Sequence, residues 1–358
     1  MYKKMLKRVL GCALSVCLLA GCGASGTATT SSENDGKAAE SELPVLKAAV
    51  MPFLNSVPVN YIVDNGLDKK YGFKLETVQF VSGGSMNEAI ASNAWDVAVM
   101  STASVYALAT YQAYLIADFA DSAGGTGIYV RPDSEIASVK GYNPTYPEVM
   151  GDPDTVRGKQ IIYQNGHVSH MTALKWLEKI GVNPDEVEVV NMEQASAYQA
   201  FLAGEGDAAA LAPSVSYAGE EQGWVCVADL NNLDVPQNES VIATPKAYDE
   251  KHDLLVAFVK ALFEANEALC KDQDLEVQLL SDWYKKNGSD IDEETVRKEV
   301  EMRPLLTAEE AKNMELGAST KANAEFFVEI GTLEADKLSI YDTNIVTDIV
   351  EEAIGYGK

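Results

Sequence analysis

Short apolar runs alternate with amphipathic segments at the start of the main body of the chain. Runs at 46–51 and 96–100 predict buried strands, and an alternating segment at 74–80 predicts a third strand. Apolar positions at helical spacing predict helices at 59–63 and after residue 86. The order strand, helix, strand at this spacing is typical of a βαβ unit with parallel strands.

The same pattern occurs a second time further along the chain. Residues 158–163, 187–191 and 207–211 predict strands, and 171–180 and 195–202 predict the helices between them. An aspartate precedes a buried strand in each half, at Asp96 and at Asp207, and we expect these two side chains to orient turns. The repetition predicts two α/β lobes of similar construction.

Two further predicted strands lie where one half of the pattern passes into the other, at 127–130 and 240–243. The chain is therefore expected to cross twice between lobes. We predict a discontinuous first lobe, 44–129 and 242–345, and a second lobe, 130–241. The part of the first lobe after residue 245 is expected to be helical.

The beginning of the chain has a different composition. Four basic residues precede an apolar run at 9–20, which is shorter than the roughly 20 residues that span a bilayer. The stretch Leu19-Ala20-Gly21-Cys22 resembles the bacterial lipobox, which implies a cleaved signal peptide at 1–21 and a lipid, such as palmitate, on Cys22. Residues 22–43 are small and polar and predict a flexible tether. We expect a lipoprotein on the extracytoplasmic face of the cell membrane.

The net charge and the cysteine content argue against two further kinds of function, nucleic-acid binding and metal binding. The formal net charge is −26, which excludes nucleic acid as a partner because its binding needs a basic surface. Cys226 and Cys270 lack metal-ligand spacing, and the chain has 3 histidines, so we expect neither a metal site nor a cofactor. Cys226 and Cys270 could pair with each other in an oxidising compartment, but we favour buried free thiols for both. The protein is expected to be a monomer.

The loops that follow the predicted strands carry the candidate ligand-binding residues, because ligands of open parallel sheets bind at the carboxyl ends of strands. Ser85 together with Glu88 also fits a capping box at a helix start. No nucleophile or acid accompanies the loop histidines, so no catalytic residue is assigned. The candidates are Phe53, Asn55, Gly84, Ser85, Ser101, Thr102, His167, Ser169, His170 and Ser214.

Several short motifs occur together, in order, at 52–55, 71–76, 82–84, 93–98, 157–159 and 203–209. With them, roughly 46–332 resembles the substrate-binding lipoproteins of ABC importers, in the group that handles sulfonates, nitrate and thiamine-precursor pyrimidines. The resemblance implies a type II periplasmic-binding-protein fold, with two Rossmann-like lobes joined by two hinge strands. It also implies that closing lobes capture a small ligand and deliver it to an ABC permease and its ATPase.

The resemblance implies an anionic or heteroaromatic ligand of the sulfonate, nitrate or pyrimidine class. In that group an acidic head often meets amides at helix starts, which here are Gly84–Ser85 and 167–170. These loops contain no arginine, and this departure counts against a sulfonate.

Two other functions compete with import. Leu54-Asn55-Ser56-Val57-Pro58 resembles a motif in the chorismate dehydratases of menaquinone synthesis, and pyrimidine synthases for thiamine have a similar fold. Those enzymes act in the cytoplasm, so the export signal argues against them. A sensor that presents its ligand to a signalling receptor is compatible with the same sequence features.

Overall fold

The computed structural model describes residues 43–213 and 215–357. The predicted signal peptide, the tether up to residue 42, Cys22 and Ser214 lie outside the described residues.

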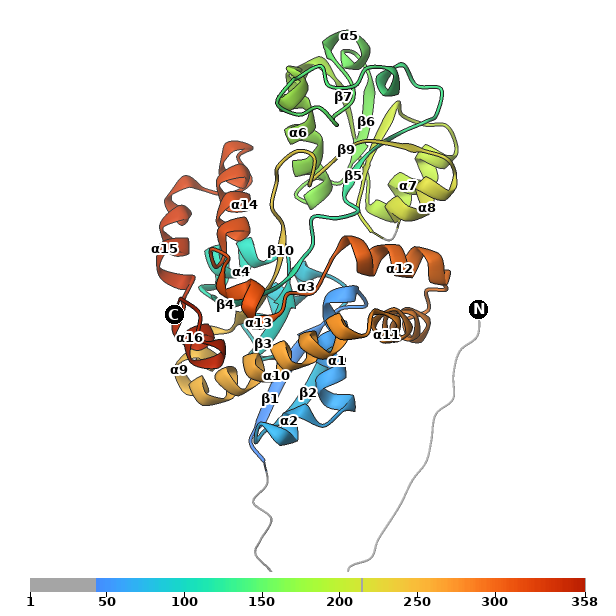
Figure 1. The fold of residues 1–358 in the computed structure, drawn as a ribbon. Coiled ribbons are helices and arrows are strands. Elements are labelled where there is room, and N and C mark those ends of the chain that lie inside the picture. The colour runs from blue at the N-terminus through green and yellow to red at the C-terminus, as the bar shows by residue number, and fades with distance from the viewer. Residues whose placement is uncertain (1–42, 214, 358) are drawn as a thin grey trace, which may run out of the picture. The chain divides into compact units, whose positions relative to one another are not determined.

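Two sheets of five strands each carry the fold (Figure 1). The first sheet has the order β2-β1-β3-β10-β4. In it β1 pairs in parallel with β2 and β3, and β10 runs antiparallel to both β3 and β4. Its strands are β1 (Val45–Val50), β2 (Lys74–Gln79), β3 (Val97–Met100), β4 (Tyr114–Asp121) and β10 (Asn238–Ala243).

The second sheet repeats this arrangement, with the order β7-β6-β8-β5-β9. Here β6 pairs in parallel with β7 and β8, and β5 runs antiparallel to β8 and β9. Its strands are β5 (Gly127–Val130), β6 (Gln160–Tyr163), β7 (Glu188–Asn191), β8 (Ala208–Leu211) and β9 (Val225–Asp229). The α/β fold with two sheets is therefore confirmed, while β4 and β9 had not been predicted.

The chain passes between the sheets twice, once between β4 and β5 and once between β9 and β10. The two crossing segments are hydrogen-bonded to each other: Ser122 N donates to Gln237 O at 2.7 Å, and Leu230 N donates to Thr126 O at 3.2 Å. Both predicted crossing strands exist. Each pairs in the sheet that the chain enters, so β5 belongs to the second sheet and β10 to the first, a few residues from the predicted lobe boundaries. We call each sheet with its helices a lobe.

Helices follow the strands of both lobes. In the first lobe these are η1 (Leu54–Ser56), α1 (Val57–Asp64), α2 (Leu67–Lys70), α3 (Gly83–Ile90) and α4 (Ser104–Tyr111). In the second lobe they are η2 (Glu135–Ser138), α5 (Pro153–Val156), α6 (Val168–Ile180), η3 (Pro184–Glu186), α7 (Gln194–Leu202) and α8 (Val215–Glu221).

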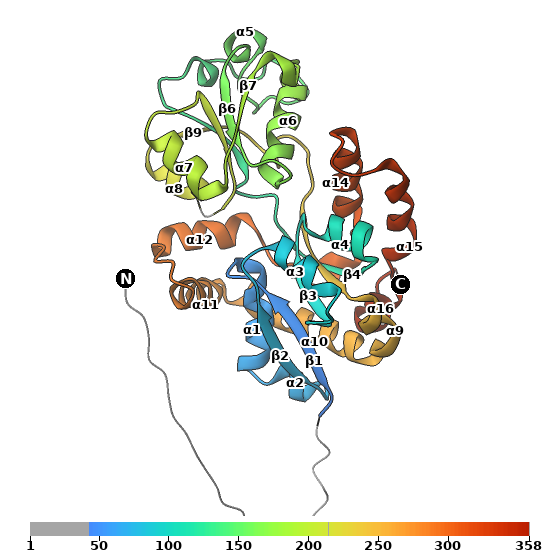
Figure 2. The same cartoon turned by 180° about the vertical axis from the view of Figure 1, so that it is seen from behind.

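The C-terminal part of the chain is helical and returns to the first lobe, as predicted. Helix α10 contacts α1, α2 and β4, and it lies on one face of the first sheet, with α3 and α4 on the other (Figures 1 and 2). The helices are α9 (Pro245–Glu250), α10 (His252–Lys271), α11 (Gln273–Lys286), α12 (Glu293–Met302), α13 (Ala308–Lys312), α14 (Ala318–Glu329), η4 (Ala335–Ile340), α15 (Tyr341–Asn344) and α16 (Asp348–Ile354).

Equivalent aspartates brace the central strands of the two sheets. Asp96 Oδ2 accepts a hydrogen bond from Lys47 N on β1 at 2.8 Å, and Asp207 Oδ2 accepts one from Gln160 N on β6 at 2.8 Å. Each carboxylate thus ties the turn before one strand to the start of its neighbour. This is the turn-orienting role expected from the sequence.

The start of α3 differs from the prediction. Ser82, not Ser85, is the N-cap: its Oγ accepts from Ser85 N at 3.2 Å, and Ser82 N donates to Ser85 Oγ at 3.3 Å. Ser82 has the extended backbone that an N-cap needs, and Ser85 takes the third position of the box that the prediction gave to Glu88. The helix therefore begins at Gly83, and Ser85 lies inside its first turn.

Cys226 and Cys270 are free and half-buried. Among the residues that the structure describes, no helix combines the length and the apolar character needed to cross a bilayer.

Candidate ligand-binding site

A cavity of about 310 Å³ lies where strands of both sheets end. The loops after β1, β2, β3, β6 and β8 contribute to its wall, together with the start of α3, the two crossing segments, one residue of β10 and one residue that follows α12. Its lining residues are Met51, Phe53, Asn55, Ser82, Gly83, Ser101, Thr102, Ala103, Ser122, Thr126, Gln164, His167, Val168, Ala212, Pro213, Gln237, Glu239 and Arg303.

The structure brings part of the predicted site together. Phe53, Asn55, Ser101, Thr102 and His167 line the cavity. Each follows a strand or lies at a helix start, as the topological argument requires. Their contact with a ligand stays a prediction.

Four other candidates do not line the cavity: Gly84, Ser85, Ser169 and His170. Because α3 begins at Gly83, the cavity meets Ser82 and Gly83 instead of the two residues that follow them. Ser214 lies outside the described residues.

Ser169 is held by neighbours within the second lobe, whereas His170 contacts both lobes, because its ring also lies edge-on to Phe326 of α14, with centroids 6.2 Å apart. The Ser169 hydroxyl is buried and accepts from Gln164 N at 3.3 Å and from Gln194 Nε2 at 3.0 Å. The His170 ring stacks on Tyr163, with ring centroids 4.6 Å apart. Neither side chain lines the cavity.

An ion cluster at the floor of the cavity was not predicted. Arg303 Nη2 donates to Glu239 Oε1 at 2.9 Å, and its Nη1 donates to Glu299 Oε1 at 3.1 Å. Asn55 Nδ2 donates to Glu239 Oε2 at 2.8 Å, and Tyr284 Oη donates to Glu299 Oε2 at 2.8 Å. Glu239 is 4% exposed, and it lines the cavity together with Asn55 and Arg303.

The cluster consists of two carboxylates and one guanidinium, and all three groups are largely shielded from solvent. Burial raises the pKa of Glu239 and of Glu299, and Arg303 opposes that rise in both. Arg303 Nε is buried and has no hydrogen-bond partner among the described residues. The guanidinium is thus already engaged by two anions before any ligand enters.

Arg303 lines the cavity, although the sequence places no arginine in the loops expected to bind an acidic head. The loops after the strands indeed lack one, but the C-terminal part of the chain supplies it. Residues 304–305 pair with β4: Asp121 N donates to Pro304 O at 2.9 Å, and Leu305 bridges to Ala120. No local pattern around Arg303 marks it as a site residue, because its place depends on how the tail packs.

His167 lies at the cavity as an electrically neutral group. Desolvation lowers its pKa to about 4. Its Nδ1 accepts from Ser169 N at 3.2 Å, so the ring also caps α6. At neutral pH it offers the cavity an uncharged imidazole.

Gln237 lies in the second crossing segment and lines the cavity. Its Nε2 donates to Ser101 Oγ at 2.6 Å, and its Oε1 accepts from Asn323 Nδ2 at 2.9 Å. Ser101 Oγ also lies 3.3 Å from Ser122 Oγ. Hydrogen bonds therefore connect Ser101 of the cavity wall to both crossing segments.

Helices of the two lobes also meet beside the cavity. Thr295 Oγ1 on α12 lies 2.6 Å from Glu221 Oε1 on α8, and Lys298 forms an ion pair with Glu220. Lys298 also lies over the ring of Tyr217, 5.5 Å from its centroid. These contacts hold the lobes in the observed arrangement.

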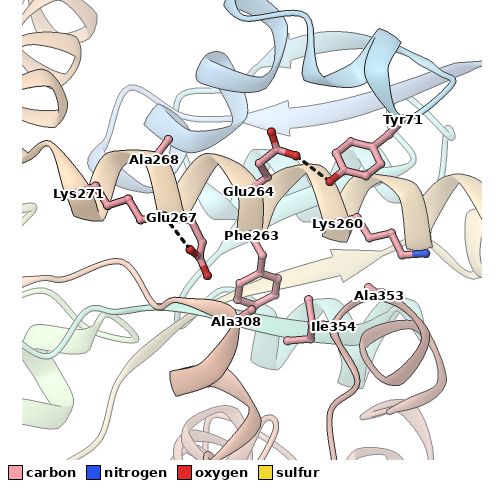
Figure 3. Close-up of a pocket in the computed structure, with 10 residues that line it drawn as sticks. All are labelled: Tyr71, Lys260, Phe263, Glu264, Glu267, Ala268, Lys271, Ala308, Ala353 and Ile354. Atoms are coloured by element: carbon pink, nitrogen blue, oxygen red, sulfur yellow. Dashed lines mark hydrogen bonds and ion pairs between the residues drawn. The ribbon is translucent and has the colours of Figure 1, made fainter.

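A larger hollow of about 630 Å³ runs along α10 (Figure 3). Two pairs of its polar groups are bonded to each other: Tyr71 Oη donates to Glu264 at 2.7 Å, and Lys271 pairs with Glu267 at 3.2 Å. Its lining comes from the first lobe alone and lies away from the strand ends. The cavity between the sheets is therefore the stronger candidate for a ligand.

Two α/β lobes, two crossing segments and a cavity at the strand ends define the class of periplasmic binding proteins. The solved periplasmic aliphatic sulphonate binding protein SsuA from Escherichia coli matches with a TM-score of 0.69 and 18% identity, over 86% of this chain and 99% of that one. The periplasmic nitrate-binding protein NrtA from Synechocystis PCC 6803 matches with a TM-score of 0.66 and 16% identity, over 87% and 88% of the two chains. At these identities the likeness shows the fold.

Sequence comparison shows the family. The sequence model of the NMT1-like family matches residues 39–278. An ABC transporter periplasmic binding protein of Brachyspira hyodysenteriae is 42% identical over 354 residues, which are 98% of this chain and 99% of the relative. The chain belongs to the NMT1-like family.

Proposed function

We propose that this protein is the substrate-binding component of an ABC importer. It holds a small solute between its lobes and delivers it to a permease and its ATPase. The name of the Brachyspira relative, an ABC transporter periplasmic binding protein, supports this role. A cavity of about 310 Å³ suits a small molecule.

The main observation behind the proposal is that both lobes contribute residues to the cavity wall. Strand ends of both sheets and both crossing segments contribute to it. A small rotation of one lobe about the crossing segments would therefore open or close the cavity, as in hinge closure around a ligand. A binding protein needs this motion to take up a solute and to release it.

A thermal-shift screen of small metabolites tests the proposal. A ligand at 100 times its Kd should raise the free energy of unfolding by about 2.7 kcal/mol.

Replacing Phe53, a cavity residue that is 40% exposed, by Ala should lower the affinity for that ligand about tenfold with little loss of stability. Tyr142→Ala removes an aromatic side chain of similar exposure, 52%, that does not line the cavity, and it is the matched control.

If no compound stabilises the protein, or if Phe53→Ala and Tyr142→Ala bind the ligand equally well, the proposal fails. Incubation with chorismate distinguishes the enzymatic alternative. A dehydrated product would favour an enzyme over a binding protein.

We also propose that a lipid on Cys22 anchors the protein to the extracytoplasmic face of the cell membrane. The lipobox-like stretch supports this anchor. Expression of Cys22→Ser in a bacterial host should move the protein from the detergent phase to the aqueous phase in a phase-partition assay. Cys226→Ser should leave it in the detergent phase; equal partitioning of the two variants would contradict the anchor.

The class of ligand is a separate question. A relative in Escherichia coli, 26% identical over 270 residues (74% of this chain, 77% of the relative), is named an aliphatic sulfonates-binding protein. Sulfonates are anions, whereas the cavity of this chain contains a buried carboxylate.

A further inference from the structure

The charges around the cavity are unusual for an anion site. The ionisable side chains among its lining residues are Glu239, Arg303 and His167. His167 is neutral at physiological pH because desolvation lowers its pKa to about 4. Any charge that a ligand meets directly comes from Glu239 and Arg303.

Arg303 is already the counter-ion of two carboxylates. Both terminal nitrogens of its guanidinium are used, one by Glu239 and one by Glu299. Each terminal nitrogen donates one of its two N–H groups to a carboxylate, and the buried Nε has no hydrogen-bond partner among the described residues. An anionic ligand at the remaining N–H groups would come close to two buried carboxylates that already share this counter-ion.

The cluster also carries an excess of negative charge. Two carboxylates face one guanidinium, and the nearby Lys298 is engaged with Glu220 on α8. With both carboxylates ionised, the cluster has a formal charge of −1, which repels a second anion at short range in a desolvated site.

Glu239 can still accept hydrogen bonds. Oε1 accepts from Arg303 and Oε2 from Asn55. A carboxylate has about four acceptor positions, so each oxygen retains capacity for an N–H donor of a ligand.

We propose that Glu239 is the specificity-determining residue of this site, and that the ligand offers it an N–H donor group, cationic or neutral, rather than an anionic head. This inference rests on the proposed function and specifies its solute class. It separates this chain from the sulfonate and nitrate binders whose fold it shares.

Three probes of similar size and shape test the inference on the wild-type protein: benzamidine, benzamide and benzenesulfonate. They present a cation with N–H donors, a neutral N–H donor and an anion, respectively. Titration calorimetry should place benzamidine first, benzamide second and benzenesulfonate last. We expect a difference of about tenfold or more between the first and the last. The ranking needs no variant, so it stands even if substitutions in the cluster impair folding.

Glu239→Gln removes the charge and keeps the shape. It should abolish the preference for benzamidine and raise the affinity for benzenesulfonate several-fold. Glu264→Gln, which alters a carboxylate in the α10 hollow, is the matched control and should leave the ranking unchanged.

Tighter binding of benzenesulfonate than of benzamidine by the wild-type protein would overturn the inference. So would an anion as the best ligand of the metabolite screen, although the proposed function would then stand. Failure of all three probes, in a protein that the screen shows to bind a solute, would also overturn it. If the screen finds no ligand at all, the proposed function itself fails.

Discussion

At the scale of single residues, Arg303 is the counter-ion of two buried carboxylates. Its replacement by Gln leaves Glu239 and Glu299 together without a guanidinium, which should lower the free energy of unfolding by about 3–5 kcal/mol. Arg297→Gln is the matched control, because Arg297 pairs with Asp274 and Glu293 at the surface and its replacement should change stability little.

The loss of stability in Arg303→Gln should be smaller at low pH than at high pH. Without Arg303, the pKa of each carboxyl is raised further, and protonation relieves the repulsion between them. Urea unfolding should therefore show a smaller deficit for Arg303→Gln at pH 5 than at pH 8. Equal deficits for the Arg303 and Arg297 variants would contradict this account of the cluster.

His167 gives a second prediction at this scale. An unfolded histidine takes up a proton near pH 6.5, whereas His167 in the folded protein does so at about pH 4. Between these values the unfolded state binds more protons, so this residue makes stability fall as the pH is lowered, by at most about 1.4 kcal/mol per pH unit.

His167→Asn keeps a side chain that can cap α6 and removes the titrating ring, so the decline between pH 6.5 and 5 should become shallower. The measurement is urea unfolding across this pH range. An unchanged slope in His167→Asn would show that the ring is not held neutral.

At the scale of elements, α3 and α4 approach each other closely where both reach the cavity. A Cβ on Gly83 would lie 2.4 Å from the Cβ of Ala103, whereas a Cβ on Gly84 would have only the Ser82 Oγ within reach, at 3.8 Å. Gly83→Ala should push the two helices apart, lower stability by about 1–3 kcal/mol and weaken ligand binding.

Gly84→Ala is the matched control at the next position of the same helix. It should change stability by less than about 1 kcal/mol, since Ala favours a helix over Gly. Thermal unfolding and ligand titration of both variants provide the test. If both behave alike, close packing of α3 on α4 does not shape the wall.

The strands and helices of both halves were largely predictable because their hydrophobic periods are local properties of the sequence. The run at 96–100 predicts β3 for this reason, and 171–180 predicts most of α6. The start of α3 was placed wrongly because two serines, Ser82 and Ser85, both precede helical residues. Only the backbone, extended at Ser82, decides which of them is the cap.

At the scale of the whole molecule, contacts between α8 and α12 stabilise the observed arrangement of the lobes. Lys298→Gln removes the ion pair with Glu220, and because the pair is partly exposed it should contribute no more than about 1 kcal/mol. If these contacts favour the ligand-bound arrangement, dissociation should become a few-fold faster, as stopped-flow measurement would show. Lys70→Gln, which breaks an ion pair within the first lobe, should leave dissociation unchanged. Equal rates in both variants would remove the contact from the closing motion.

The cavity floor shows what the sequence could not supply at this scale. Asn55 and Glu239 are 184 residues apart in the chain, yet their side chains are hydrogen-bonded. Arg303 reaches them only because the tail folds back along β4. Loop residues such as Ser101 and Thr102 could be predicted from the rule for strand ends, but a cluster built by tertiary packing has no local signature.

The central claim is that one small solute is held between the lobes, and native mass spectrometry of the purified protein tests it most directly. Masses of one sample under native and denaturing conditions separate a non-covalent ligand from any covalent lipid. We predict a native mass that exceeds the denatured mass by one small molecule per chain, and a smaller occupied fraction in Phe53→Ala than in Tyr142→Ala. Identical native and denatured masses, in a protein saturated with the best compound of the screen, would contradict the claim.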